Sequence, residues 1–371
     1  MTEKRGARLP GGTRPEGWIC RLRHPLGWGI ATSDSLQSLS DTLLGAIFLV
    51  GVVVSLGASW ALVVRLERVG ARLGLSEALL GMLAALAADA PEITAAVTAL
   101  ARHDTHIGAG VVIGSNVFNL AALLGLAAVV AGRISLHRRV IELGGAVSLW
   151  IAGICVLVVV GTLPPAVGLL AALALMLPYL AILGIGRERL AGLRLPGAWA
   201  SWLAEAVSEE EQELEVAIHP DRGGVRDGVL AALAVLVVVG ASIAMERTGS
   251  ELGARHAIPG IVIGGLILAA VTSLPNAVAA VYLASRGRGA ATLSTALNSN
   301  ALNVVAGLLI PGAIVGLGAP SGPTTFVAVS YLGLAAAALA IAYLDRGLRR
   351  LPGALIIAAY VAFALVLVNG A

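Results

Sequence analysis

Long apolar runs follow one another along the chain from about residue 42 to its end. Each run is long enough to cross a lipid bilayer, for which about 20 helical residues suffice. Clusters of Pro, Gly and Arg separate the runs. The pattern predicts ten transmembrane helices, at residues 42–64, 75–101, 107–131, 139–161, 164–186, 227–247, 257–285, 289–316, 323–344 and 353–370. An all-α polytopic membrane protein is therefore expected.

One hydrophilic segment precedes the apolar runs and another interrupts them. Residues 1–40 are rich in Arg, Gly and Ser and lack the apolar core of a signal peptide, so they are expected to form a polar tail. Residues 187–226 contain an acidic run at 209–215 and are expected to be a solvated linker between two halves, 41–186 and 227–371. A regulatory cation site in the linker is less favoured, because no EF-hand loop is present.

Composition agrees with a membrane protein, since 58% of the residues are hydrophobic and only 13% are charged. The two cysteines, Cys20 and Cys155, differ too much in their surroundings to suggest a disulfide or a metal site. The formal net charge of +3 comes from Arg residues between apolar runs, where membrane topology explains them. No nucleic-acid partner is indicated. The expected partners are the bilayer and metal ions, and the oligomeric state is left open.

The chain also contains an internal repeat. Residues 81–119 align without a gap with residues 265–303, and ten of the 39 columns are identical. The matches include Pro91 with Pro275, Ser115 with Ser299, and Asn119 with Asn303. Because the two copies lie five crossings apart, they enter the membrane from opposite sides. Two inverted-topology repeats of five helices are predicted, an arrangement found in secondary transporters with a midplane site.

The Arg residues predict the orientation. Loops that follow odd-numbered helices, with the linker, contain sixteen Arg residues, whereas the other loops contain three. Because cytoplasmic loops are enriched in Arg, the odd loops and the linker should be cytoplasmic and both termini outside, in the plasma (inner) membrane. The amino-terminal tail is itself basic, so the same rule would place it in the cytoplasm, which opposes this orientation.

Two prolines mark candidate breaks in the membrane helices. Pro91 and Pro275 occupy the middle of spanning segments, where proline removes a backbone donor and crowds the carbonyl one turn earlier. Carbonyls near Ala87 and Val271 should therefore be loosened from their helices. Free carbonyls are tolerated inside a bilayer only where they meet protein, water or a cation. A harmless packing kink is the alternative, which the repetition makes less favoured.

Polar side chains surround both prolines at helical spacing. They are Asp89 with Glu92, Ser273 with Asn276, Ser115 with Asn119, and Ser299 with Asn303. Each pair lies on one helix face. Together they supply carboxylate, amide and hydroxyl oxygens, which hard cations such as Ca²⁺ prefer. The alternative is hydrogen bonding between packed helices, which is favoured for Asn116 and Asn300 because they point away from these faces.

These paired blocks resemble the two alpha-repeats of the cation/calcium exchanger superfamily, which includes sodium/calcium exchangers. The family pattern is close to G-T-S-L-P-E in one helix and G-S-N-x-F-N in the next. Residues 87–92 and 114–119 here read AADAPE and GSNVFN, and residues 271–276 and 298–303 read VTSLPN and NSNALN. The resemblance covers essentially all ten helices. It implies a ten-helix exchanger with four cation sites at its centre.

Carried over by position, the resemblance implies a set of ion ligands. They are Asp89, Glu92, Ser115, Asn119, Ser273, Asn276, Ser299 and Asn303. Backbone ligands are also implied near Ala88 and Thr272. The family's second glutamate is Asn276 here, an acidic residue often found at position 303 is Asn303, and Asp89 replaces a usual serine. Both carboxylates therefore lie on one helix, which favours sharing a proton when no cation is bound.

The first functional hypothesis is an antiporter that moves Ca²⁺, or a similar divalent cation, in exchange for Na⁺. Exchange against H⁺ is the alternative that the Asp89/Glu92 pair favours. A cation channel is a further alternative. An intramembrane hydrolase is disfavoured, because no second catalytic aspartate and no Ser/His pairing occur in the spans. The protein is expected not to be an enzyme and to need no cofactor, the transported ions being Ca²⁺ and Na⁺ or H⁺.

Overall fold

The computed structural model describes residues 36–75, 77–136, 138–190, 201–203, 205 and 223–370, with the backbone alone at 77–81 and 184–190. Two compact units are formed by residues 1–39 and 40–371, and the fold described below is that of the second. Most of the predicted polar tail, 1–35, and the acidic run at 209–215 lie outside the described residues.

The prediction of ten transmembrane helices is confirmed. Eight helical segments of the described chain are long and apolar enough to cross a membrane, and two bent helix pairs bring the number to ten. In the first half the spans are α2 (Asp41–Leu73), α3 with α4 (Glu77–Ala88, Ala90–Ala101), α5 with η1 and α6 (Thr105–Asn119, Leu120–Leu126, Ala127–Ala131), α7 (Arg138–Val159) and α8 (Pro165–Leu190).

The second half repeats this order of elements. Its spans are α10 (Val225–Arg255), α11 with η2, α12 and α13 (Gly260–Val262, Ile263–Leu268, Ala269–Thr272, Leu274–Ser285), α14 with η3 and α15 (Gly289–Leu302, Asn303–Leu309, Ile310–Val315), α16 (Gly322–Leu344) and α17 (Arg350–Gly370). The η segments are π-helical turns, which the sequence pattern did not predict. Such turns are rare and occur frequently at functional sites.

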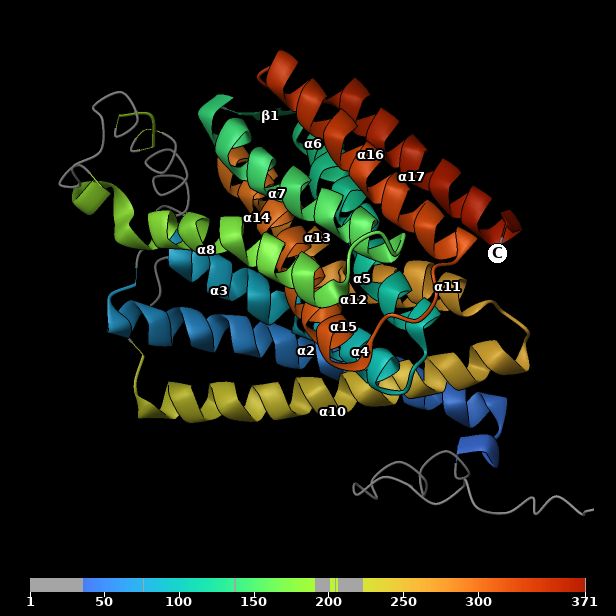
Figure 1. Ribbon diagram of the computed structural model, residues 1–371. Coiled ribbons are helices and arrows are strands. Elements are labelled where there is room, and N and C mark those ends of the chain that lie inside the picture. Colours follow the sequence, from blue (N-terminus) through green and yellow to red (C-terminus); the bar gives the residue numbers. More distant parts are fainter. Residues whose placement is uncertain are drawn as a thin grey trace, which may run out of the picture. The chain divides into compact units, whose positions relative to one another are not determined.

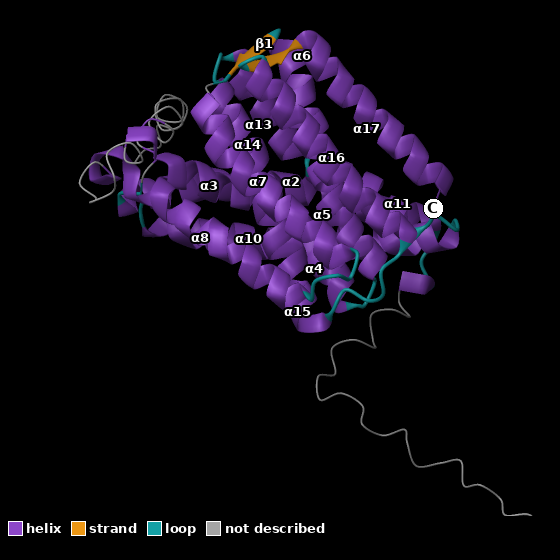
Figure 2. Ribbon diagram, turned by 45° about the horizontal axis from the view of Figure 1, so that its top comes forward, coloured by secondary structure: helices purple, strands orange, loops and turns teal. Residues whose placement is uncertain are grey.

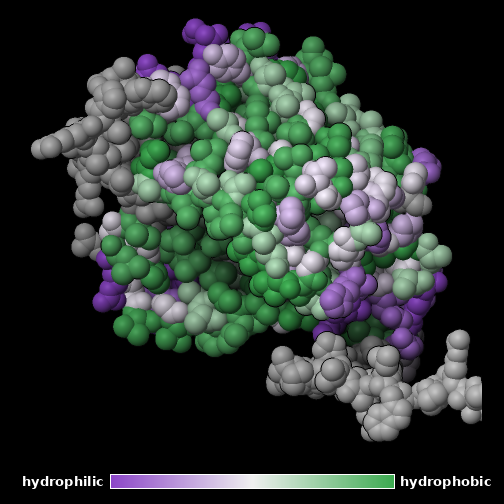
Figure 3. All heavy atoms as spheres, viewed as in Figure 1, coloured by the Kyte–Doolittle hydropathy of each residue, from purple (hydrophilic) through white to green (hydrophobic). Residues whose placement is uncertain are grey.

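Burial separates central spans from peripheral ones. The most apolar window of the α5–α6 span is 89% buried, whereas the windows of α2 and α10 are only 22% buried. Large apolar side chains such as Val53 on α2 and Leu236 on α10 are correspondingly exposed. Figure 3 shows hydrophobic side chains over much of one face, with hydrophilic ones gathered toward its edges. This surface suits a protein whose middle is surrounded by lipid.

The two longest helices, α2 and α10, form an antiparallel pair that is joined at both ends (Figure 1). Near the end of α2, Arg65 forms a 2.7 Å ion pair with Asp227 at the start of α10. At the opposite end, Arg255 of α10 forms a 2.7 Å ion pair with Asp41 of α2. These contacts extend both helices beyond their predicted bounds, because each charged end finds a partner on the other helix.

The central spans approach each other through glycine. Gly110 and Gly114 of α5 face Gly264 and Gly265 of η2, and a Cβ atom at Gly110 would lie 2.9 Å from the Gly265 backbone nitrogen. Small residues four apart allow such close backbone contact between membrane helices. The contact joins the third span of one half to the seventh span in the other, at the centre of the molecule.

A short antiparallel ladder supplements the helices (Figure 2). Strand β1 (Arg133–Ser135) pairs with β2 (Gly347–Arg349), with Ile134 opposite Leu348. Nearby, the Arg138 guanidinium lies 5.0 Å from the centre of the Tyr343 ring. The ladder joins the loops after the third and ninth spans, so both loops lie at one end of the molecule. We call this end, which also holds the ends of α2 and α8, the linker end.

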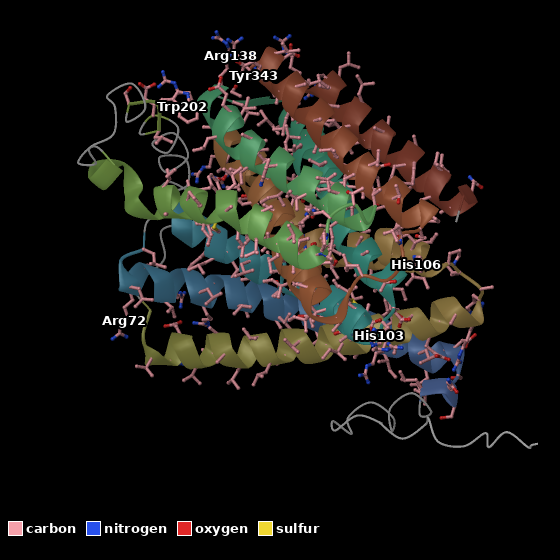
Figure 4. All side chains as sticks on the ribbon, viewed as in Figure 1. Arg72, His103, His106, Arg138, Trp202 and Tyr343 are labelled. Carbon is pink, nitrogen blue, oxygen red and sulfur yellow. The ribbon has the colours of Figure 1, made fainter. Side chains whose placement is uncertain are left out.

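Labelled side chains mark the two ends in Figure 4. Arg72, Arg138 and Trp202 lie toward the left of the view, whereas His103 and His106 lie toward the right. Trp202 donates a 3.3 Å hydrogen bond to Glu142 on α7, and His106 lies 3.2 Å from the Thr324 hydroxyl of α16. The loops that were predicted to share one side of the membrane therefore lie at the same end.

The glycine contact generates a stability prediction. Gly110→Ala should lower the unfolding free energy by about 1–3 kcal/mol, because the added methyl group forces α5 away from η2. Gly57→Ala on α2 is the matched control, since a Cβ there meets nothing within 4 Å. Thermal unfolding of both variants in detergent measures the difference. Equal melting temperatures would mean that the two spans are not closely packed.

Candidate cation site

The first break in a membrane helix occurs at Asp89, between α3 and α4, where the two segments bend by 52°. Pro91 follows in the first turn of α4 and has no N–H for the Ala87 carbonyl. That carbonyl instead accepts a 2.9 Å hydrogen bond from Ser59 Oγ on α2. The sequence predicted the loosened carbonyl at Ala87. The contact with Ser59, which comes from another span, was not predicted.

The second half repeats this geometry at Ser273, between α12 and α13, with a bend of 47°. The backbone angles of Ser273 (φ −83°, ψ −2°) nearly equal those of Asp89 (φ −80°, ψ −8°). Pro275 lies in the first turn of α13, as Pro91 does in α4. The two spans therefore break at equivalent points of the repeat.

Each carboxylate of the first half is held by side chains of the second half. Glu92 Oε1 accepts a hydrogen bond from Ser273 Oγ and Oε2 accepts one from Asn303 Nδ2, both at 2.5 Å. Asp89 Oδ1 accepts hydrogen bonds from Asn276 Nδ2 at 2.5 Å and Ser299 Oγ at 2.7 Å. The network joins two broken spans and the helices that follow them in the two halves.

Four buried oxygen atoms in this region have no hydrogen-bond partner. They are Asp89 Oδ2, Ser115 Oγ, Asn119 Oδ1 and Asn303 Oδ1. Ser115 faces Glu92 without a hydrogen bond of good geometry. Asn119 Nδ2 donates to Ser299 Oγ at 3.3 Å and to Asn300 Oδ1 at 3.0 Å, whereas Asn119 Oδ1 accepts no hydrogen bond. Buried polar atoms are nearly always paired, so four such oxygens in one place call for a ligand.

All eight residues of the predicted ligand set are therefore brought into one region. Seven of them join the hydrogen-bond network and Ser115 borders it, and none is more than 1% exposed. In the described chain, neither carboxylate has an ion pair with a basic side chain. Burying two unpaired carboxylates is costly, so a proton or a cation must compensate their charge.

The residues expected to contribute backbone groups, Ala88 and Thr272, flank the two breaks. The Ala88 carbonyl lies 3.5 Å from Ser59 Oγ. Thr272 is buried, and its hydroxyl donates to the Leu268 carbonyl at 2.9 Å. This hydroxyl therefore stabilises its own helix, one residue before the break at Ser273.

Asn116 and Asn300 link the two halves directly. Asn116 Nδ2 donates to the Asn300 carbonyl at 3.0 Å, and Asn300 Nδ2 donates to the Asn116 carbonyl at 3.2 Å. These reciprocal hydrogen bonds suit the packing role expected for the two residues, and their side-chain oxygens also accept hydrogen bonds from Asn303 at 3.4 Å and Asn119 at 3.0 Å. They hold α5 and α14 together beside the site.

A cleft of about 390 Å³ reaches the site beside α2 and α3, where Figure 3 shows the surface hollowed. Ala88, Pro275 and Asn276 line its inner part. Its walls are mainly apolar, with Glu67 of α2 as the charged side chain in its lining. Glu67 lies between Ser59 and the linker end of α2, so the cleft extends from the site toward that end. The sequence analysis did not single out Glu67.

The chemistry of the site favours a hard cation. Its donors are carboxylate, amide and hydroxyl oxygens, whereas softer metals prefer thiolate and imidazole. In the described part of the chain no group of three or more His, Cys, Asp or Glu residues could hold a metal ion. The arrangement suits a cation that sheds its water and takes oxygens from both halves.

Comparison with known proteins agrees with the division of the fold into two halves. Residues 43–185 and 228–369 match the family model described as sodium/calcium exchanger protein. The two matched segments correspond to the two halves of the fold. No curated protein sequence gives a significant match.

Several solved structures share the fold at low sequence identity. The H⁺/Ca²⁺ exchanger CAX is 15% identical with a TM-score of 0.63, covering 91% of this chain and 88% of that one. The sodium-calcium exchanger NCX_Mj, soaked with Na⁺ and Sr²⁺, is 19% identical with a TM-score of 0.57, covering 87% and 98%. YfkE is 17% identical with a TM-score of 0.58, covering 90% and 95%.

These likenesses establish the fold, and the family model covers most of the chain. The chain therefore belongs to the sodium/calcium exchanger protein family, and it is an integral multi-pass membrane protein of a family of cation transporters rather than enzymes.

Proposed function

We propose that the protein is a secondary antiporter that moves Ca²⁺ in exchange for Na⁺, through one central site exposed alternately to the two faces of the membrane. The observation that carries the proposal is the group of four buried oxygens without donors, beside two carboxylates without basic partners. A cation bound there would be coordinated by the four oxygens and would balance the charge of the two carboxylates. The proposed ligands are Asp89, Glu92, Ser115, Asn119, Ser273, Asn276, Ser299 and Asn303.

Charge and donor number favour Ca²⁺ as the substrate. Ca²⁺ takes six to eight oxygen ligands at about 2.3–2.6 Å, and the eight side chains supply enough oxygens for this shell. Two carboxylates balance one Ca²⁺. When Ca²⁺ leaves, Na⁺ ions can compensate the same charge with the same oxygen donors, so one site can serve both substrates in turn.

Exchange against H⁺ is the second candidate, and one observation favours it. Asp89 and Glu92 lie three residues apart at the same helix break, and neither has a basic partner in the described chain. Two neighbouring carboxylates bind a proton more readily than a single one, because like charges oppose each other. A proton on this pair would then replace Na⁺ as the counter-ion.

The two halves provide a basis for alternating access. In this proposal residues 41–186 and 227–371 act as two exchanger domains joined by the linker 187–226. The cleft beside α2 is the open path toward the linker end. Because the halves have opposite topology, an equivalent path on the other side can form between α10 and the first half.

A transport assay tests the proposed function. ⁴⁵Ca uptake into proteoliposomes should occur under an outward Na⁺ gradient, because Na⁺ leaving the site frees it for Ca²⁺. Glu92→Ala should abolish uptake, since it removes one of the two charges that balance Ca²⁺. The control is Asn369→Ala, whose side chain bonds only its own helix and is exposed.

The same assay separates the alternatives. Uptake driven by a pH gradient and not by Na⁺ would identify H⁺ as the counter-ion. Flux that needs no opposing gradient would indicate a channel. Full uptake by Glu92→Ala would remove Glu92 from the site and contradict the proposal.

A second prediction concerns ion preference. Asn276→Glu places a third carboxylate beside Asp89, whose Oδ1 now accepts a 2.5 Å hydrogen bond from Asn276. We expect the ratio of half-saturating Ca²⁺ to half-saturating Na⁺ to change by about tenfold, because one added charge acts at short range in a buried site. Asn369→Glu on the exposed surface is the control. An unaltered ratio in a folded Asn276→Glu variant would mean that Asn276 serves only in packing.

We further propose that the protein lies in the plasma (inner) membrane, with both termini outside and the linker in the cytoplasm. The distribution of Arg among the loops supports this orientation. A thiol reagent that does not cross membranes should then label Cys20 in intact cells, because Cys155 is buried. In a Cys20→Ser background, Glu211→Cys should be labelled only after permeabilisation. The reverse pattern would invert the topology.

A further inference from the structure

Glu67 on α2 is a carboxylate for which the proposed transport cycle has no role so far. It is half-buried in the cleft that reaches the central site. Within the described part of the chain it makes no ion pair and no hydrogen bond. The nearby Arg65 and Arg68 are directed to Asp227 at the start of α10, at 2.7 Å and 3.7 Å. These arginines therefore neutralise Asp227 and leave Glu67 without a counter-charge.

The cleft connects Glu67 to the site. Ser59 and Glu67 both line it, together with Ala88 and Asn276 at the inner end. Glu67 lies eight positions after Ser59, so the two residues are about 12 Å apart along the axis of α2. A cation that enters from the linker end passes Glu67 before it reaches Asn276 and its neighbour Asp89.

The second half of the molecule provides a contrast. The long helix α10 also carries one buried acid, Glu246, four residues after Ser242. Its Oε2 lies 3.4 Å from Arg102, and its Oε1 accepts a 2.9 Å hydrogen bond from Ser250. Glu246 is fully buried, and it does not line the cleft that holds Glu67. Glu67 and Glu246 thus each lie on a long helix, and of these two acids only Glu67, which lines the cleft, has no partner in the described chain.

Two arginines at equivalent positions of the repeat also differ in their partners. Arg102 and Arg286 occupy equivalent positions of the repeat, just after α4 and α13. Arg102 pairs with Glu246, whereas Arg286 lies over the Tyr282 ring at 5.3 Å and forms no ion pair in the described residues. Glu246 is thus neutralised by Arg102, whereas Glu67, which lines the cleft, is available to an entering ion.

We propose that Glu67 is a cation-recruiting residue at the mouth of the cleft. It attracts a hydrated divalent cation, holds it by its carboxylate through water, and passes it to the central ligands. The inference rests on the proposed function of the central site. An unpaired carboxylate facing lipid is costly, so water must reach Glu67 through the cleft. A negative group between apolar walls concentrates cations there, because low-dielectric walls focus its field.

Transport kinetics from each face test the role of Glu67. In vesicles of known orientation, Glu67→Gln should raise half-saturating Ca²⁺ about fivefold at the linker face, with the maximal rate and the opposite face unchanged. Added choline chloride at about 0.5 M should reduce this difference by screening. Glu67→Asp should restore the wild-type value. Asp345→Asn is the control, an exposed acid at the linker end that does not line the cleft.

The outcomes separate this inference from the proposed function. Unchanged half-saturation for Glu67→Gln, or an equal change at both faces, would overturn the role of Glu67 while Glu92-dependent transport still stands. A second measurement needs no transport. In a Cys20→Ser background, Glu67→Cys should react with a charged, water-soluble thiol reagent from the linker face and not from the opposite face. Absence of reaction would mean that the cleft holds lipid rather than water, and the proposal would be wrong.

Discussion

The structure depends on two carboxylates buried in the middle of a membrane protein without a basic side chain to balance them. Asp89 and Glu92 are fully buried, and in the described residues their hydrogen-bond donors are neutral hydroxyl and amide groups. Neutral donors stabilise negative charge but do not cancel it. A site of this kind is therefore incomplete until a cation or a proton enters, and this requirement makes it suitable for exchange.

The inverted repeat places the partners of these carboxylates. The first half contributes both acids, and the second half contributes Ser273 and Asn303 for one and Asn276 and Ser299 for the other. Neither half alone could satisfy its own polar groups within the bilayer. The glycine contact between α5 and η2 brings the two halves close enough for these hydrogen bonds. Packing and ion binding consequently depend on the same interface.

Much of this architecture was predictable from the sequence, because its signals are local or repeated. Apolar runs predicted the ten spans, and prolines at equivalent positions of the repeat predicted both breaks. Two residues that recur in register, Ser299 and Asn303, donate to Asp89 and Glu92, and the other two donors, Ser273 and Asn276, occupy the positions that the acids hold in the first copy. The contacts that were not predicted join residues distant in the chain and leave no periodic pattern. Ser59 bonds Ala87 from another span, Arg255 reaches Asp41, and Glu67 lines a cleft formed by four spans.

The central claim is that residues of both halves enclose one dehydrated cation. The most direct test is a structure determined from protein soaked in Sr²⁺, which scatters anomalously and can replace Ca²⁺. We expect a peak within about 2.3–2.6 Å, or slightly more for the larger ion, of oxygens from Asp89, Glu92 and the Ser and Asn residues of the network. A peak bound elsewhere, or hydrogen bonds around the two carboxylates that stay unchanged at saturating Sr²⁺, would contradict it.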